Sequence, residues 1–116
     1  MVGLGSDVAG GHSESMFNVM CYTVQVSKLY WRLKDNNEAN LTFKEAFYLA
    51  TKGGGKFFGN VGSFEEGFDF SAVVLDDGLI ERPFELSIEK RLEAAAYTAL
   101  DLYGIVGKFV LDKKII

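Results

Sequence analysis

The spacing of apolar residues changes several times along the chain, and each change predicts an element. The short apolar run at 2–6 is typical of a strand, and the polar, glycine-rich residues 7–12 predict the turn that follows it. From Met16 to Val26 nearly every position is apolar, so a helix there would be buried on more than one side. Ser13 is placed to cap this helix, and Asp35-Asn36-Asn37 predicts its end.

A second helix has the clearest start signal in the sequence. Thr42 and Glu45 form the pattern of a capping box, in which each side chain accepts a hydrogen bond from a free backbone N–H. Apolar residues follow at helical spacing: Phe43, Ala46, Phe47 and Ala50. We expect Gly53-Gly54-Gly55 to stop this helix and to allow close packing, with a short further turn over 56–58.

The second half of the chain predicts short strands joined by turns. Residues 61–70 read as a connector rich in turns, and it leads into a strand at 72–75. Residues 105–111 and 115–116 predict a terminal hairpin around the turn Asp112-Lys113-Lys114.

A third helix is predicted between these strands, over 87–103, with Ser87 as its cap. Its apolar face consists of Ile88, Leu92, Ala95, Ala96, Ala99 and Tyr103. The predicted order of elements is therefore strand, helices, strand, helix and hairpin.

Composition bounds the class of protein. The 116 residues are 48% apolar, enough for a packed core, but far short of the roughly 250 residues of an eight-stranded barrel. The net charge of −4, with no basic stripe, argues against a nucleic-acid partner. No apolar run approaches the roughly 18 residues of a membrane span, and we expect no secretory leader. Cys21 is the single cysteine, so we expect an inert core thiol and a cytoplasmic location.

Several passages resemble one known family. The opening run Val2-Gly3-Leu4-Gly5-Ser6-Asp7-Val8-Ala9-Gly10-Gly11 resembles the last barrel strand of the amidohydrolase superfamily, and within it the guanine deaminases. Residues 50–59 resemble the helix-glycine-helix passage that follows their barrel. Residues 61–74 resemble the segment that returns to their small β-sandwich, although Ser71 stands where the family usually has aspartate. Residues 85–97 resemble the family's last long helix.

The resemblance implies an α+β fold, the C-terminal fragment of a (β/α)8 amidohydrolase barrel with part of the small β-sandwich domain. Residues 1–60 would hold the last barrel strand and the helices after it. Residues 61–116 would hold the return to the sandwich, with the helix at 87–103 and the terminal hairpin. Guanine deaminases carry Leu-Gly-Asp-Asp-Arg-Asn-Ile after that helix, whereas residues 99–105 read Ala-Leu-Asp-Leu-Tyr-Gly-Ile here. This departure leaves other ring substrates open.

The same resemblance implies the chemistry. The aspartate that matches Asp7 is expected to bind a divalent metal, usually zinc, and to accept a proton from the metal-bound water. The reaction would be hydrolysis of guanine to xanthine and ammonia, a step of purine catabolism, with Asp7 both catalytic and metal-binding. A catalytic zinc usually needs three protein ligands, and this chain has one histidine and one cysteine. We therefore expect the fragment alone to be inactive and not to bind zinc tightly.

Each candidate residue also has a purely structural explanation. Asp7 precedes a glycine-rich turn and could be a cap in any fold. His12 could contact the substrate or be a loop residue near the helix start. Gly10 and Gly11 could let the backbone approach the substrate, or they could serve only the tight turn.

Three functions remain open at this point. The first is the C-terminal part of a zinc-dependent guanine deaminase that acts on a small purine. The second is a fragment of another amidohydrolase, such as a chlorohydrolase or an adenosine-type deaminase. The third is a non-catalytic packing or oligomerisation module, because the apolar helix at 16–26 would expose adhesive surface. We expect a homo-oligomer and no membrane partner.

Overall fold

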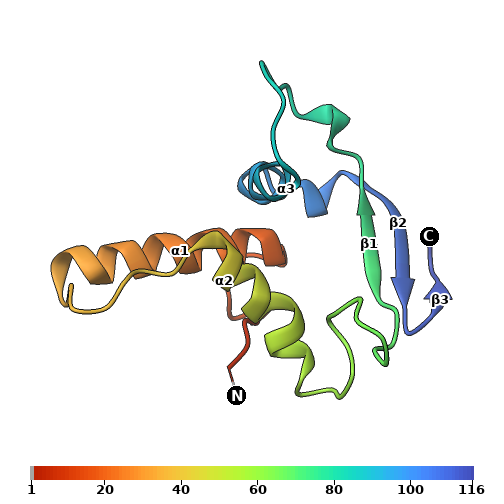
Figure 1. The fold of residues 1–116 in the computed structure, drawn as a ribbon, viewed down its shortest axis with the longest axis horizontal. Helices are drawn as coiled ribbons and strands as arrows, with labels where there is room; N and C mark the ends of the chain where they lie inside the picture. The colour runs from red at the N-terminus through yellow and green to blue at the C-terminus, as the bar shows by residue number, and fades with distance from the viewer. Residues whose placement is uncertain (1) are drawn as a thin grey trace.

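Helices and a three-stranded sheet make up the computed structural model, which describes residues 2–116 (Figure 1). In chain order the elements are α1 (Met16–Leu33), α2 (Phe43–Tyr48), a π-helical segment (Leu49–Gly53), β1 (Ala72–Leu75), a 3-10 turn (Asp77–Leu79), α3 (Ile88–Tyr97), a second 3-10 turn (Leu100–Leu102), β2 (Ile105–Val110) and β3 (Lys113–Lys114). Helices α1 and α2 lie against each other on one side of the molecule, and the sheet stands on the other side. The α+β composition is as predicted.

The helices pack around a small apolar core. Its buried residues come from all three helices: Met20, Cys21 and Val24 of α1, Phe43 and Ala46 of α2, and Ala96 of α3. Ala46 and Ala96 have no exposed surface, so α2 and α3 approach α1 closely. Leu4, in the run before α1, packs against the same cluster. Cys21 is buried, which confirms the predicted core thiol, and burial raises the pKa of that thiol.

Helix α1 begins two residues later than the sequence predicts. Ser15, not Ser13, is the N-cap, because the Ser15 hydroxyl accepts a hydrogen bond from the Asn18 N–H at 3.0 Å. Ser13 accepts instead from the Ser15 N–H at 3.1 Å and so supports the cap. The Ser15 hydroxyl also donates to Asp101, a long-range contact that local sequence does not reveal. The predicted end of the helix is confirmed, since it stops at Leu33.

The capping box at the start of α2 is confirmed. The Thr42 hydroxyl accepts from the Glu45 N–H at 3.2 Å, and the Glu45 carboxylate accepts from the Thr42 N–H at 2.8 Å. The bond from the Thr42 backbone is the main cause of a lowered pKa at Glu45. Two backbone donors that a helix start leaves free are thereby satisfied.

Removing the Thr42 hydroxyl should weaken the start of α2. We expect Thr42→Ala to lower the free energy of unfolding by about 1 kcal/mol, because the Glu45 N–H loses its acceptor. Urea unfolding of the two proteins measures the difference. Thr42→Ser keeps the hydroxyl and is the matched control. Equal stability of the alanine and serine variants would contradict the prediction.

The prediction that Gly53-Gly54-Gly55 stops this helix is confirmed. The helical path runs from α2 through the π-helical segment, which ends at Gly53 with Gly54 as its C-cap, and residues 56–58 form the predicted turn. The predicted close packing is confirmed. A Cβ on Gly55 would lie 2.1 Å from the Val61 carbonyl oxygen, and one on Gly53 would lie 3.1 Å from the Val2 carbonyl oxygen. The absence of side chains thus brings the N-terminal run and the connector directly against the helical backbone.

The predicted strand at 2–6 is wrong for the described residues. A strand is defined by hydrogen bonds to a neighbouring strand. The Leu4 N–H instead donates to the Leu49 carbonyl at 3.0 Å, and Leu49 lies in the π-helical segment. No strand within residues 2–116 pairs with this run. Its role as a barrel strand, and the division of the chain near residue 60, stay predictions.

The sheet contains the predicted strand at 72–75 and a shifted version of the predicted hairpin. Strand β1 pairs antiparallel with β2, with Ala72 opposite Phe109. Strand β3 pairs with β2 through Lys113 and Lys114, which the sequence places in the turn. The turn falls earlier because the Asp112 N–H donates to the Phe70 carbonyl at 2.8 Å, and the Asp112 carboxylate accepts from the Phe70 N–H at 3.1 Å.

Helix α3 starts as predicted and ends early. The Ser87 hydroxyl accepts from the Lys90 N–H, which confirms the cap. The helix stops at Tyr97 rather than at 103, because Ala99 adopts a left-handed backbone with φ +51°. The residues beyond it form the separate 3-10 turn that holds Asp101. The predicted apolar face is therefore divided between two elements.

Asp77 joins the loop after β1 to α3. Its carboxylate accepts hydrogen bonds from Arg91 at 2.7 and 2.9 Å and from Arg82 at 2.6 Å. The Arg91 guanidinium, with Arg82 beside it, lowers the pKa of Asp77 from its ordinary 3.8 to about 2.

The lowered pKa of Asp77 predicts a pH-dependent contribution to stability. The contribution is fully present above pH 3.8 and is lost as the pH falls toward about 2, because the unfolded carboxyl then binds a proton more readily than the folded one. We expect Asp77→Asn to be less stable than wild type at pH 7 and to approach wild type at pH 2.5. Urea unfolding at both pH values measures this. A difference independent of pH would contradict it, and Asp35→Asn, in the exposed turn after α1, is the control.

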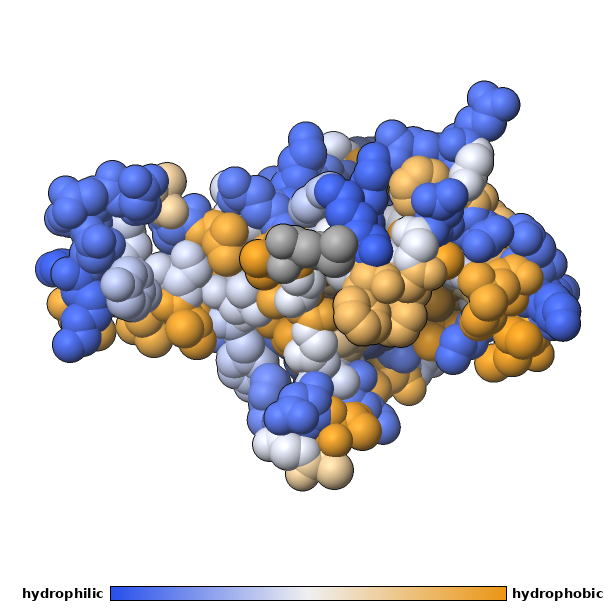
Figure 2. Space-filling model, turned by 90° about the horizontal axis from the view of Figure 1, so that it is seen from below, coloured by the Kyte–Doolittle hydropathy of each residue, from blue (hydrophilic) through white to orange (hydrophobic). Residues whose placement is uncertain are grey.

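Apolar side chains remain on the surface of the described chain. Figure 2 shows hydrophobic residues gathered in several patches between hydrophilic ones. The C-terminal half of α1 contributes Val26, Leu29, Tyr30, Trp31 and Leu33, and the turn after the glycine triplet contributes Phe57 and Phe58. Such surface favours self-association, and the predicted homo-oligomer stays a prediction. Within residues 2–116, none of the helices has the length and apolar character needed to cross a membrane.

Candidate active site

The turn that carries Asp7 has an unusual backbone. Asp7 has φ +48° and Ala9 has φ +80°, both in the left-handed region that residues with a side chain seldom adopt. The Asp7 carbonyl accepts hydrogen bonds from the N–H groups of Gly10, at 2.9 Å, and of Gly11. Strained residues of this kind persist only where the surroundings hold them, and they cluster at functional sites. Leu111 and Asp112 of the hairpin turn also have positive φ, so this backbone fixes the direction of the Asp7 side chain but does not by itself assign a function.

The turn requires a glycine at position 11, and Gly10 leaves room for the Asp7 side chain in its present position. A Cβ on Gly10 would lie 2.7 Å from an oxygen of the Asp7 carboxylate, so Gly10 leaves the space that the carboxylate occupies. A Cβ on Gly11 would lie 2.0 Å from the Ser6 carbonyl oxygen. The structural explanation for the two glycines is therefore supported. Their predicted contact with a substrate stays a prediction.

His12 lies on the surface next to α1. Its ring meets the ring of Tyr22 edge to face, with centroids 4.3 Å apart. The two rings line a shallow hollow together with Gly5, Ser6, Thr23 and Leu41. This contact anchors the end of the turn on α1. A substrate-side role for His12 stays a prediction.

A complete metal site is not formed by the described residues. Within residues 2–116, the side chains of His, Cys, Asp and Glu nowhere form a group of three or more that could hold a metal ion. The carboxylate of Asp7 could supply one ligand, whereas a catalytic zinc usually takes three from the protein. The donor set therefore does not fit the implied zinc on its own.

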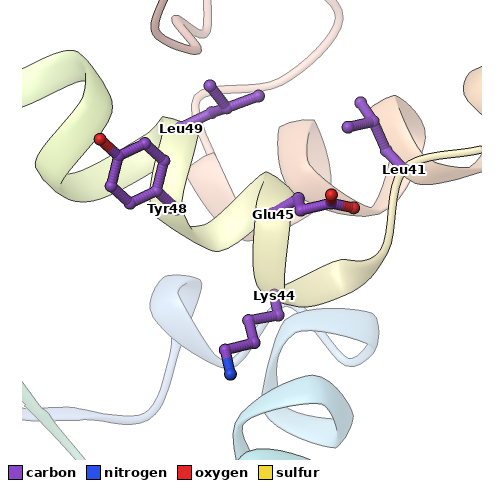
Figure 3. Close-up of a pocket in the computed structure, with 5 residues that line it drawn as sticks. All are labelled: Leu41, Lys44, Glu45, Tyr48 and Leu49. Carbon is purple, nitrogen blue, oxygen red and sulfur yellow. The ribbon is translucent and has the colours of Figure 1, made fainter.

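A second hollow lies along α2 and contains none of the predicted site residues (Figure 3). Leu41, Lys44, Glu45, Tyr48 and Leu49 line it. In Figure 3 the Lys44 amine points away from the Glu45 carboxylate, so their charges do not converge on one point. Glu45 is also committed to the capping box. This hollow offers no arrangement for catalysis.

The structure adds one residue that the sequence does not single out. Asp101 lies in the 3-10 turn after α3, and its carboxylate contacts the N-terminus of α1 through Ser15 and Phe17. The only sequence signal is that an aspartate persists in the divergent stretch at 99–105. Asp101 lies 86 residues from Ser15 and 84 residues from Phe17 in the sequence. Local patterns do not reveal it.

Comparisons with known proteins all point to one family. A family model described as "Amidohydrolase family" matches residues 1–113. Guanine deaminase of Mus musculus is 41% identical over 88 residues, which cover 73% of this chain and 19% of that protein. Guanine deaminase of Homo sapiens is 40% identical over a stretch of the same length. The chain thus spans about a fifth of the length of the curated relatives it matches.

A solved structure is also similar over nearly the whole chain. It is the crystal structure of guanine deaminase from C. acetobutylicum with guanine bound in the active site. It superposes with a TM-score of 0.90 at 43% sequence identity, and the likeness covers 99% of this chain and 27% of that one. The arrangement of the turn, the helices and the sheet is therefore one that an intact amidohydrolase also contains.

Proposed function

This chain belongs to the amidohydrolase family, and from that premise we propose that it is the C-terminal part of a guanine deaminase. The observation that carries the proposal is the likeness, at 43% identity over nearly all of the chain, to an enzyme crystallised with guanine in its active site. The reaction is hydrolysis: water adds its oxygen to the ring carbon that bears the amino group, the carbon–nitrogen bond breaks, and xanthine and ammonia are released.

Within this reaction we assign proton transfer to Asp7. Its carboxylate accepts a proton from the attacking water and returns it to the departing amino group, so the nitrogen leaves as neutral ammonia. The left-handed backbone at Asp7 and the open space at Gly10 support this role, because both serve to direct one carboxylate. His12, Gly10 and Gly11 would lie on the substrate side of the same turn.

The rest of the site must come from outside the described residues. Since residues 2–116 do not complete a metal site, we assign no step to zinc, and a ligand role for Asp7 stays a prediction. We expect residues 1–116 alone to release no ammonia from guanine and to retain no zinc after dialysis. Stoichiometric retained zinc would contradict this expectation.

A panel of substrates tests the proposed function and separates it from the alternatives. The full-length protein that carries this chain is incubated with guanine, adenine, adenosine and a chlorotriazine, and ammonia or chloride release is measured. We expect ammonia and xanthine from guanine, with at least a tenfold preference over the other compounds. If the protein turns over only another ring compound, it is an active amidohydrolase, but guanine is not its substrate. Inactivity on every compound by folded protein would favour the non-catalytic module.

A further inference from the structure

The N-terminus of α1 is held by a carboxylate from the far end of the chain. Asp101 accepts a hydrogen bond from the Ser15 hydroxyl at 2.7 Å with one oxygen, and from the Phe17 N–H at 3.3 Å with the other. A negative charge at a helix N-terminus is favourable, because the free N–H groups there carry partial positive charge. Asp101 is therefore a second cap on α1, added to the local cap by Ser15.

Asp101 is itself fixed by its surroundings. Ala99, with its left-handed backbone, directs the chain into the 3-10 turn, and Leu100 beside it is fully buried. The Gly104 N–H donates to the Leu100 carbonyl at 2.7 Å, and the Gly104 carbonyl accepts from the Asp76 N–H at 2.8 Å. The turn is thus tied to the end of β1. The carboxylate belongs to a braced element and not to a free loop.

Ser15 connects the fixed Asp101 carboxylate to the segment that precedes α1. Its side chain is 1% exposed, and its hydroxyl both accepts from the Asn18 N–H and donates to Asp101. Ser15 is the last residue of the short segment that begins at Asp7. At the other end, the bond from the Leu4 N–H to the Leu49 carbonyl fixes the chain. The turn at Asp7 lies between these two anchors, and the contact of His12 with Tyr22 holds its end on α1, the helix whose start Ser15 and Asp101 cap.

We propose that Asp101 is a positioning residue for Asp7: by bonding Ser15 and the start of α1, it sets the place of the turn that carries the catalytic carboxylate. The effect on turnover rests on the proposed function, whereas the effect on the turn does not. Asp101 touches no reacting atom in this account. It acts through Ser15 and the backbone of residues 7–15.

The test uses the full-length protein with Asp101→Asn, an isosteric change that keeps one acceptor oxygen and removes the charge. We expect amide hydrogen exchange in residues 7–12 to become about tenfold faster, with the sheet peptide at 105–110 unchanged. We expect kcat for guanine to fall at least tenfold with KM within about threefold, because misplacing a catalytic group lowers turnover more than binding. Asp112→Asn is the matched control, since Asp112 also accepts a backbone N–H, far from the turn.

A second variant keeps the proposal testable if Asp101→Asn folds poorly. Ser15→Ala removes the partner hydroxyl, and the loss in kcat of the double variant should be smaller than the sum of the two single losses, because the Ser15–Asp101 bond is common to both. Unchanged exchange at residues 7–12 overturns the proposal, and so does faster exchange with unchanged kcat. Additive losses in the double variant also overturn it. If wild type itself does not deaminate guanine, the proposed function fails, and the exchange measurement alone decides the role of Asp101.

Discussion

Asp7→Asn is expected to lower kcat for guanine deamination about a thousandfold in the full-length protein, with the fold intact. An amide cannot accept the proton of the attacking water, and general acid–base groups typically contribute factors of about 10² to 10⁴. Asparagine tolerates the left-handed backbone that Asp7 adopts, at φ +48°, so the turn should survive the change. Ammonia release under saturating guanine measures the effect.

The control for this experiment is Asp69→Asn. Asp69 is an exposed carboxylate on the connector before β1, so its loss should change kcat by less than about twofold. Circular dichroism and thermal unfolding show whether both variants keep the fold. If a folded Asp7→Asn protein has the wild-type kcat on guanine, Asp7 does not transfer a proton in the reaction, even though guanine is the substrate.

Gly11→Ala should have the second largest effect, through geometry rather than chemistry. The new methyl group would lie 2.0 Å from the Ser6 carbonyl oxygen, a distance that the backbone cannot accommodate without moving, and 3.0 Å from the Asp7 carbonyl oxygen. The turn must therefore rebuild and move Asp7. We expect kcat to fall about a hundredfold, the loss typical of a displacement of about 1 Å in a catalytic group. Steady-state kinetics on guanine measures it.

Gly5→Ala is a matched control two positions before Asp7. Nothing lies within 4 Å of a Cβ on Gly5, so the same substitution should leave kcat near the wild-type value. Similar losses in both variants would indicate a general intolerance of the segment to alanine. We expect the two substitutions to differ, because only a Cβ on Gly11 would press against the backbone of the turn.

Elements whose determinants are local in sequence could be predicted. The Thr42–Glu45 capping box and the Ser87 cap are confirmed, because the groups that form them lie within a few residues of one another. The strand at 72–75 is also confirmed, from its short apolar run, although its partner β2 is distant in sequence. The end of α1 follows from the polar residues after Leu33. Periodicity and capping chemistry therefore suffice for the starts of α2 and α3 and for the end of α1.

Elements set by distant contacts could not be predicted. The N-cap of α1 is Ser15, whose hydroxyl donates to Asp101 from the other end of the chain. Helix α3 ends at Tyr97, because Ala99 has a left-handed backbone and leads into the 3-10 turn. The hairpin turn is shifted by two bonds between Asp112 and Phe70. None of these pairings has a signature in neighbouring residues.

The candidate site shows the same division. The resemblance of the opening run singles out Asp7, and the structure adds the strained backbone and the reasons for Gly10 and Gly11. Asp101 escapes sequence analysis because its contacts with α1 cross more than 80 residues. The glycine triplet ends the helical path, as the sequence predicts, and the structure adds the close backbone contacts that exclude a side chain at Gly55.

The role of Asp7 can be tested by a crystal structure of the full-length protein with bound guanine. We expect an Asp7 carboxylate oxygen to lie about 3 Å from the amino group of guanine, or to reach the amino-bearing carbon through one bridging water. We also expect the left-handed backbone at Asp7 and the bond between Asp101 and Ser15. An Asp7 carboxylate turned away from guanine, beyond the reach of one bridging water, would show that Asp7 does not transfer the proton.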